Sequence, residues 1–196
     1  RVTMASQIAG ADETVSSLYS VKSEQATMLS FDTYNYLVHY FGQPQGSMAD
    51  DPNGTLGGDY EFVISDATAD RIELKGKKYG NRIVMKAFSA DQTWKQYLTR
   101  IKKVEDDAFF YEYDLRMDGL YTGQMLRSNY TFIVTYYDEV GKVHQKTVSF
   151  MFTTDGMRFH EPVTIDGQTM QNFVWKNEEI SFVCTDEGAT GVKMKG

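Results

Sequence analysis

Residues 130–150 read YTFIVTYYDEVGKVHQKTVSF and predict a β-hairpin. Residues 130–137 and 142–150 are rich in β-branched and aromatic side chains, which favour the half-buried surface of a strand. The residues between these runs, Asp138-Glu139-Val140-Gly141, have the composition of a turn. This stretch therefore predicts two adjacent antiparallel strands in the carboxy-terminal half of the chain.

The same pattern continues on both sides of this hairpin. Strand-like runs occur at residues 109–115, 173–175 and 180–184. Asp-Gly pairs at residues 118–119, 155–156 and 166–167 are typical of the tight turns that join antiparallel strands. We therefore expect residues 108–196 to form a carboxy-terminal β region, with the last dozen residues frayed.

Residues 1–88 predict a second, amino-terminal β region. Strands are expected at residues 60–64, 71–75 and 82–87, with a glycine-containing turn at 76–81. Residues 1–6 alternate like a strand already in progress, so we expect this region to be truncated at its start, within a longer precursor. Residues 42–58 are rich in Gly, Asp, Pro and Asn and predict a mobile loop; an irregular calcium site at 50–54 is a weaker alternative.

A helix is expected between the two β regions, at residues 89–107. Ser89 and Gln92 fit a capping box at its start. Trp94, Leu98, Ile101 and Val104 then recur at helical spacing and form one apolar stripe. We expect Trp94 to be mostly buried against a sheet, so that its replacement by alanine would cost about 3–5 kcal/mol.

The composition agrees with a mostly β fold. The chain has 196 residues, enough for one large or two small domains, and 14% of them are aromatic. Because hairpin follows hairpin without long crossovers, we expect antiparallel meanders in two calyx-like (lipocalin-like) or sandwich-like halves. One amphipathic helix lies between the halves, and a short helix follows the first strands.

Composition also excludes several classes of protein. The single Cys excludes an intrachain disulfide framework, and Cys184 is expected to be a core residue. No apolar run reaches the roughly 18 residues of a membrane helix, so no membrane span is expected. A net charge of −7 disfavours nucleic acid as a partner. Residues 71–103, with 10 basic and 2 acidic side chains, predict a solvated basic face or, alternatively, a surface for an anionic glycan or lipid headgroup.

Catalytic motifs are missing from the sequence. There is no G-x-S-x-G elbow, phosphate-binding loop or dinucleotide fingerprint, and His39, His144 and His160 are scattered. We therefore predict no catalytic residue, metal or cofactor. Asp59 and Glu61, two apart on an expected strand, share a face and leave a carboxylate-pair hydrolase as an alternative.

The best candidates for ligand binding lie near an aromatic cluster at residues 34–41. A short helix capped by Asp32 or Thr33 and ending at Phe41 would bury Tyr34, Leu37, Val38 and Phe41 on one side. Tyr36 and Tyr40 would then face a ligand, because flat aromatic rings can stack on sugar rings. The candidate ligand-binding residues are Tyr36, His39, Tyr40, Asp59 and Glu61.

Five sequence blocks resemble a family of uncharacterised Bacteroidetes cell-envelope lipoproteins with a domain of unknown function. They are LSFDTYNYLVHYF (29–41), GGDYEFVI (57–64), LKGKK (74–78), FMFTTDGM (150–157) and Glu161-Pro162. The resemblance implies an exported protein, periplasmic or anchored at the outer membrane by a lipid on a Cys in an additional amino-terminal segment. It supplies no catalytic residues.

Three functions remain as hypotheses. The leading one is a non-enzymatic cell-envelope protein that binds a glycan or a small hydrophobic molecule. The alternatives are a hydrolase acting on an envelope or dietary polymer, and a structural or interaction subunit of an outer-membrane complex.

Overall fold

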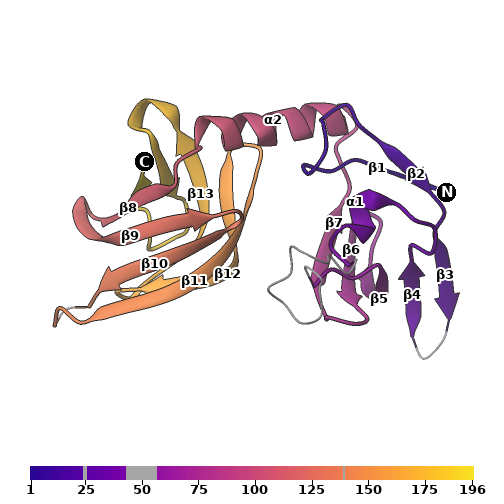
Figure 1. Cartoon of the computed structure of the whole chain (residues 1–196), viewed down its shortest axis with the longest axis horizontal. Coiled ribbons are helices and arrows are strands. Elements are labelled where there is room, and N and C mark those ends of the chain that lie inside the picture. Colours follow the sequence, from indigo (N-terminus) through magenta and orange to yellow (C-terminus); the bar gives the residue numbers. More distant parts are fainter. Residues whose placement is uncertain (24–25, 43–56, 139) are drawn as a thin grey trace, which may run out of the picture. The chain divides into compact units, whose positions relative to one another are not determined.

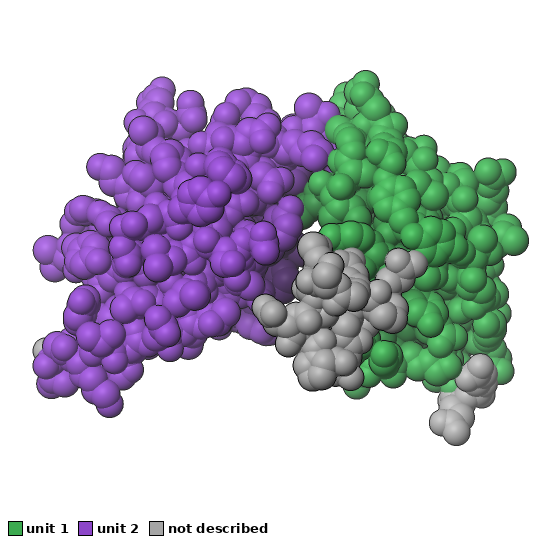
Figure 2. Space-filling model, in the orientation of Figure 1, with its two compact units in different colours: residues 1–96 green, residues 97–196 purple. Residues whose placement is uncertain are grey.

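A computed structural model describes residues 1–23, 26–42, 57–138 and 140–196. The chain divides into two compact units, residues 1–96 and 97–196, which are coloured separately in Figure 2. Most of the loop predicted at 42–58, with its possible calcium site, lies outside the described residues.

The amino-terminal unit is built on an antiparallel sheet of five strands (Figure 1). Its strands, in spatial and sequence order, are β3 (Ser20–Ser23), β4 (Thr27–Ser30), β5 (Glu61–Ala67), β6 (Arg71–Gly76) and β7 (Arg82–Lys86). A separate pair, β1 (Val2–Met4) and β2 (Val15–Ser17), also runs antiparallel. Phe31, Phe62 and Leu74 form the buried core of this unit. The predicted strands and the turn between β6 and β7 are confirmed.

The short helix of this unit, α1 (Tyr36–His39), begins later and is shorter than predicted. Its cap is Asn35, whose side-chain Oδ1 accepts a hydrogen bond from the Leu37 N–H at 3.1 Å. Asp32, predicted as a cap, instead accepts hydrogen bonds from Ser20 Oγ and Lys22 Nζ on strand β3. Because Tyr34 lies before the helix, it does not join the buried side with Leu37 and is 61% exposed.

The carboxy-terminal unit is a closed antiparallel barrel of eight strands (Figure 1). The strands are β8 (Glu112–Met117), β9 (Leu120–Ser128), β10 (Thr131–Tyr137), β11 (Val143–Phe152), β12 (Gly156–Ile165), β13 (Gln168–Lys176), β14 (Ser181–Cys184) and β15 (Val192–Lys195). A 3-10 helix, η2 (Asn177–Glu179), separates β13 from β14. Each strand pairs with the next, and β15 pairs with β8. The mostly β fold class is confirmed, and this unit has the up-and-down order of a lipocalin-like barrel.

Two Asp-Gly turns have the left-handed backbone of tight hairpins. Asp118 and Gly119 have φ values of 48° and 83°, and Asp166 and Gly167 have φ values of 51° and 73°. Two successive positive φ values define the turn that matches the twist of paired strands. These turns join β8 to β9 and β12 to β13, as the sequence predicts.

The predicted fraying of the last dozen residues is wrong. Strand β15 lies between β14 and β8 and pairs with both, with Val192 opposite Met117 on β8. Its side chains Val192 and Met194 are fully buried. The short length of this strand concealed it in the sequence, since only two inward positions alternate with Lys193 and Lys195.

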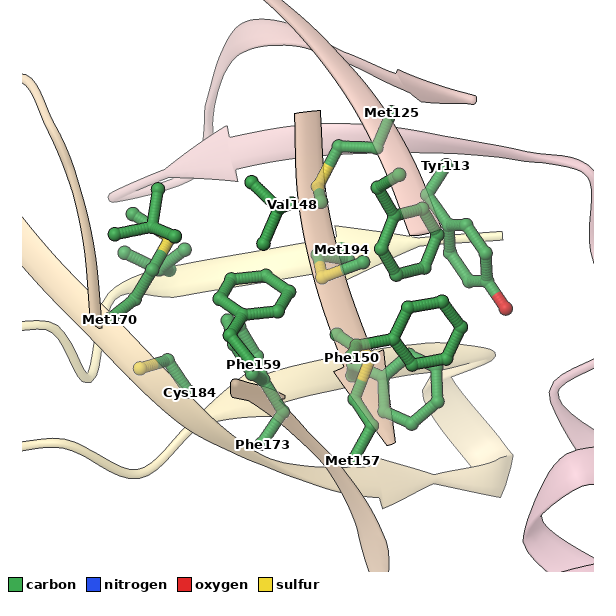
Figure 3. Close-up of a cluster of buried hydrophobic side chains, with 14 of the residues drawn as sticks. Tyr113, Met125, Val148, Phe150, Met157, Phe159, Met170, Phe173, Cys184 and Met194 are labelled. Atoms are coloured by element: carbon green, nitrogen blue, oxygen red, sulfur yellow. The ribbon is translucent and has the colours of Figure 1, made fainter. Parts of the chain in front are cut away.

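The interior of the barrel is a packed hydrophobic core (Figure 3). Phe132 and Phe150 stack with ring centroids 4.4 Å apart, and Tyr113 meets the ring of Phe132 edge-on. An eight-stranded barrel is just wide enough for its own side chains to fill. Cys184 belongs to this core, as predicted, and burial raises the pKa of its thiol to about 11.

Helix α2 (Trp94–Asp107) contains the boundary between the units and ends at the predicted residue. Ile101 and Val104 contribute to the barrel core. The cap differs from the prediction, because Thr93 Oγ1 accepts from the Gln96 N–H at 3.2 Å and Gln96 Oε1 accepts from the Thr93 N–H at 3.0 Å. The capping box is therefore Thr93 and Gln96, not Ser89 and Gln92.

The predicted burial of Trp94 is also wrong, since this side chain is 41% exposed. Trp94 is the first residue of α2, one turn before the buried Leu98. The apolar stripe is real, but its buried part begins only at Leu98.

Candidate functional site

Three rings lie in a row on the amino-terminal unit, and we call Tyr34, His39 and Tyr60 the aromatic row. The His39 ring centroid lies 5.4 Å from that of Tyr34 and 5.0 Å from that of Tyr60. The planes of His39 and Tyr60 differ by only 24°, which is a stacked arrangement. Tyr34 is 61% and Tyr60 is 44% exposed, so the two outer rings keep surface for a partner.

His39 is held in this row by the cap of its own helix. Its Nδ1 atom lies 3.2 Å from the backbone nitrogen and 2.9 Å from the backbone oxygen of Asn35. Asn35 is fully buried, and its Nδ2 donates to Ser17 Oγ at 3.2 Å. The orientation of the central ring is therefore fixed by the backbone of Asn35, a residue whose buried side chain also joins α1 to β2.

Tyr60 is held by a close approach between two backbone segments. The Gly58 N–H donates to the Phe41 carbonyl oxygen at 2.8 Å. A Cβ atom at Gly58 would lie 2.3 Å from the Cβ atom of Phe41, so only glycine permits this approach. The Tyr60 carbonyl oxygen accepts a hydrogen bond at 3.0 Å from the N–H of Phe31, a residue of the buried core.

A hollow of about 140 Å³ adjoins Tyr60, and we call it the turn hollow. It is lined by Gly42, Gly58, Asp59, Tyr60, Glu61, Lys77, Lys78 and Tyr79. Lys77 Nζ pairs with Glu61 Oε2 at 3.3 Å, and Lys78 Nζ lies 4.7 Å from the centroid of the Tyr79 ring. The hydrogen bond with the Tyr79 side chain raises the pKa of Lys78. The lining thus combines aromatic faces with charges of both signs.

Asp59 fixes the turn between β6 and β7 that forms one side of this hollow. Its Oδ1 accepts from the backbone N–H of Lys78 at 2.7 Å and of Tyr79 at 3.1 Å, and its Oδ2 accepts from Asn81 Nδ2 at 3.1 Å. The side chain is buried against Gly76, where a Cβ atom would lie 1.9 Å from Oδ2. The carboxylate is thus occupied by the turn and places Lys78 and Tyr79.

The structure brings together three of the five candidate residues. Asp59 and Glu61 line the turn hollow, and His39 joins them through its stack on Tyr60. Tyr36 instead donates to the carboxylate of Glu13, a hydrogen bond that raises the pKa of Tyr36. Tyr40 lies edge-on to Phe41, with ring centroids 5.3 Å apart.

Sequence reasoning missed Tyr34, Tyr60, Lys78 and Tyr79 as members of the site. The sequence pattern places Tyr34 on the buried side of a longer helix. Tyr60 follows Gly57-Gly58-Asp59, and Lys78 and Tyr79 lie inside a glycine-flanked turn. An aromatic residue in or beside such a turn is a usable signal, because turns lie at the surface and carry functional side chains.

The two candidate carboxylates of this region are already engaged by other groups. Asp59 is committed to the turn, and Glu61 is paired with Lys77. Among the residues that the structure describes, no group of three or more His, Cys, Asp or Glu side chains could hold a metal ion.

None of the helices in the described ranges is both long and apolar enough to cross a membrane.

Together these features define an antiparallel β protein with two units, a packed barrel and a sheet unit that carries a row of aromatic rings at its surface. The chain belongs to the family defined by the domain of unknown function DUF4302, whose model matches residues 1–177. The match covers the whole sheet unit and the barrel up to the end of β13. Comparison with curated proteins and with solved structures gave no match.

Proposed function

We propose that the amino-terminal unit binds a glycan at the aromatic row and the turn hollow. The observation that carries this proposal is the stacking of Tyr34, His39 and Tyr60 beside a hollow with charged and hydrogen-bonding side chains. A sugar ring has an apolar C–H face that packs on an aromatic ring and hydroxyl groups that need polar partners. Two exposed tyrosines at either end of the row offer faces for successive sugar units.

The packed barrel favours a surface glycan over a small hydrophobic ligand. Such a ligand would need an apolar cavity, and the barrel interior is occupied by Phe132, Phe150 and the other rings of its core. The aromatic row, in contrast, presents its rings at the surface, where an extended polymer can reach them.

We further propose that the protein acts at the cell envelope. The support is the resemblance of residues 29–41, 57–64 and 150–157 to exported Bacteroidetes lipoproteins. A lipid anchor on a preceding segment would hold the glycan site at the membrane surface. Incorporation of radiolabelled palmitate into the full precursor, and its loss when the candidate lipidated Cys is replaced, would test this location.

Affinity gel electrophoresis tests glycan binding directly. The purified chain is run in gels containing xylan, starch, polygalacturonate or chondroitin sulfate, and retarded migration in at least one gel is expected. Tyr60→Ala and Tyr34→Ala should each abolish most of the retardation. Tyr121→Ala is the matched control, because this tyrosine is 53% exposed but lies on β9 of the barrel unit.

Two results would overturn the proposal. One is normal migration in all four gels; the other is equal retardation of the Tyr34→Ala, Tyr60→Ala double variant and the unaltered chain. Hydrolysis of any of these polymers that disappears in Glu61→Gln would instead favour a hydrolase.

A further inference from the structure

Arg127, on the barrel unit, is a buried cation at the wall of a second hollow. We call this the barrel hollow; it has a volume of about 250 Å³ and is lined by Phe109, Phe110, Tyr111, Arg127, Ser128 and Asn129. The Arg127 side chain is only 9% exposed. A buried charge is costly unless it is paired and hydrogen-bonded, so its partners decide what this arginine does.

The partners of Arg127 leave part of the guanidinium unsatisfied. Nε donates to the Asn129 carbonyl oxygen at 3.1 Å, and Nη2 lies 3.5 Å from Glu105 Oε1. The same Glu105 oxygen accepts from the Tyr130 hydroxyl at 3.3 Å, so it is shared between two donors. Nη1 is buried and has no hydrogen-bond partner among the described residues. Buried donors nearly always have an acceptor, so the unpaired Nη1 indicates that a bound molecule could supply one.

Aromatic rings surround this guanidinium and hold it in place. Its central carbon lies 5.2 Å from the ring centroid of Phe109, 5.1 Å from that of Phe152 and 5.8 Å from that of Phe150. Phe150 and Phe152 are buried in the barrel core. Phe109 and Tyr111 are 60% and 75% exposed and meet edge-on, so these two rings can turn without loss of core packing.

We propose that the barrel hollow binds a small organic carboxylate, an anion separate from the glycan of the amino-terminal unit. The carboxylate would accept hydrogen bonds from Arg127, including Nη1, after the exposed ring of Phe109 turns aside. The planar or ring-shaped body of the ligand would pack between Phe109 and Tyr111, and Ser128 and Asn129 offer polar atoms at the rim. Arginine is suited to this role because its planar guanidinium matches the geometry of a carboxylate.

The volume and the shared Glu105 narrow the class of ligand. A hollow of about 250 Å³ holds one ring with its acid group, such as an aromatic acid or a sugar acid, and not a long lipid. Glu105 competes with the ligand for the same cation, so affinity is set by how much of the guanidinium charge Glu105 leaves uncompensated.

NMR titration of the intact chain tests the proposal, with the Arg127 Nε–Hε resonance as the readout. The probes are sodium benzoate and sodium galacturonate, with benzyl alcohol and galactose as their neutral counterparts and sodium chloride at equal ionic strength. Saturable shifts of the Arg127 resonance with at least one carboxylate, and not with its neutral counterpart, are expected. Benzoate and galacturonate distinguish an aromatic acid from a sugar acid.

Three variants separate ligand binding from a purely structural role of Arg127. Tyr111→Ala removes a wall without touching the core and should weaken binding about tenfold. Glu105→Gln should strengthen it, a gain that a structural role would not produce. Tyr121→Ala should leave it unchanged. The proposal would be overturned by an Arg127 resonance that responds to neither carboxylate, or that responds to each carboxylate no more than to its neutral counterpart.

Discussion

His39 stacks on Tyr60 with ring centroids 5.0 Å apart, although the first residue ends a helix and the second precedes a strand. The stack exists because two independent devices meet there. One is the buried cap Asn35, which holds His39, and the other is the close approach of Gly58 to Phe41, which holds Tyr60. The contact that holds His39 is made by backbone atoms, whereas the approach that holds Tyr60 depends on the missing side chain of Gly58.

Asn35→Ala should destabilise the amino-terminal unit by about 2–3 kcal/mol, since it removes a helix cap and leaves Ser17 without a buried partner. Urea denaturation followed by circular dichroism measures this loss. Thr33→Ala is the matched control, because Thr33 is an exposed neighbour and its replacement should change stability by less than about 0.5 kcal/mol. A larger effect at Thr33 than at Asn35 would contradict the observed cap.

Asp59→Asn should loosen the turn between β6 and β7 and cost about 2–3 kcal/mol. The new amide nitrogen would replace Oδ2, which now accepts from Asn81 Nδ2 and from the Tyr79 N–H, so donors would face a donor. Hydrogen exchange at the amides of Lys78 and Tyr79 should accelerate. Asp66→Asn is the matched control, because Asp66 is largely exposed and only pairs with Arg71 at 3.8 Å. In this variant, hydrogen exchange at the amides of Lys78 and Tyr79 should be unchanged.

Asp32 should make the amino-terminal unit sensitive to acid. Hydrogen bonds from Ser20, Ser30 and Lys22 lower the pKa of Asp32 from 3.8 to about 2. A carboxyl whose pKa is lower in the folded state contributes stability above its unfolded pKa and loses it as pH falls through the folded value. The contribution should therefore disappear between about pH 4 and pH 2.

NMR titration of the Asp32 carboxyl carbon checks this assignment. Ser20→Ala removes the largest cause of the shift and should raise the Asp32 pKa. Asp32→Asn should remove the corresponding loss of stability in acid. An unchanged Asp32 pKa in Ser20→Ala would argue against the hydrogen bond between strand β3 and this carboxylate.

Met194→Ala should destabilise the barrel by about 2–5 kcal/mol, because this side chain is fully buried in the strand that closes it. Lys195→Ala, at the exposed neighbouring position, should have little effect. Thermal unfolding of both variants measures the difference. Equal stability of the two variants would revive the prediction of a frayed terminus.

The antiparallel meander of each unit could be predicted from local signals, and the errors have local causes too. The pairs Asp118-Gly119 and Asp166-Gly167 predict hairpins because few residue types tolerate the positive φ values of such turns. The capping-box pattern occurs twice within residues 89–96, at Ser89 and at Thr93, and the helix begins at the second. The prediction that Trp94 is buried is wrong because a periodic apolar stripe does not show at which residue the contact with a core begins.

The candidate site was less accessible to sequence reasoning because its residues converge from three segments. His39 comes from α1, Tyr60 from the segment before β5, and Lys78 and Tyr79 from the turn after β6. Their proximity depends on strand register, which joins Phe62 to Gly76, and on the approach of Gly58 to Phe41. Neither contact leaves a periodic trace in the sequence.

The pairing of β15 with β8 has a consequence for the order of folding. Met117 and Val192 are direct partners although nearly the whole barrel sequence lies between them. Contacts this distant along the chain raise the contact order and slow folding. A growing polypeptide cannot close the barrel until residues 192–195 have left the ribosome, so the nascent barrel keeps open edges that a chaperone could hold for later folding.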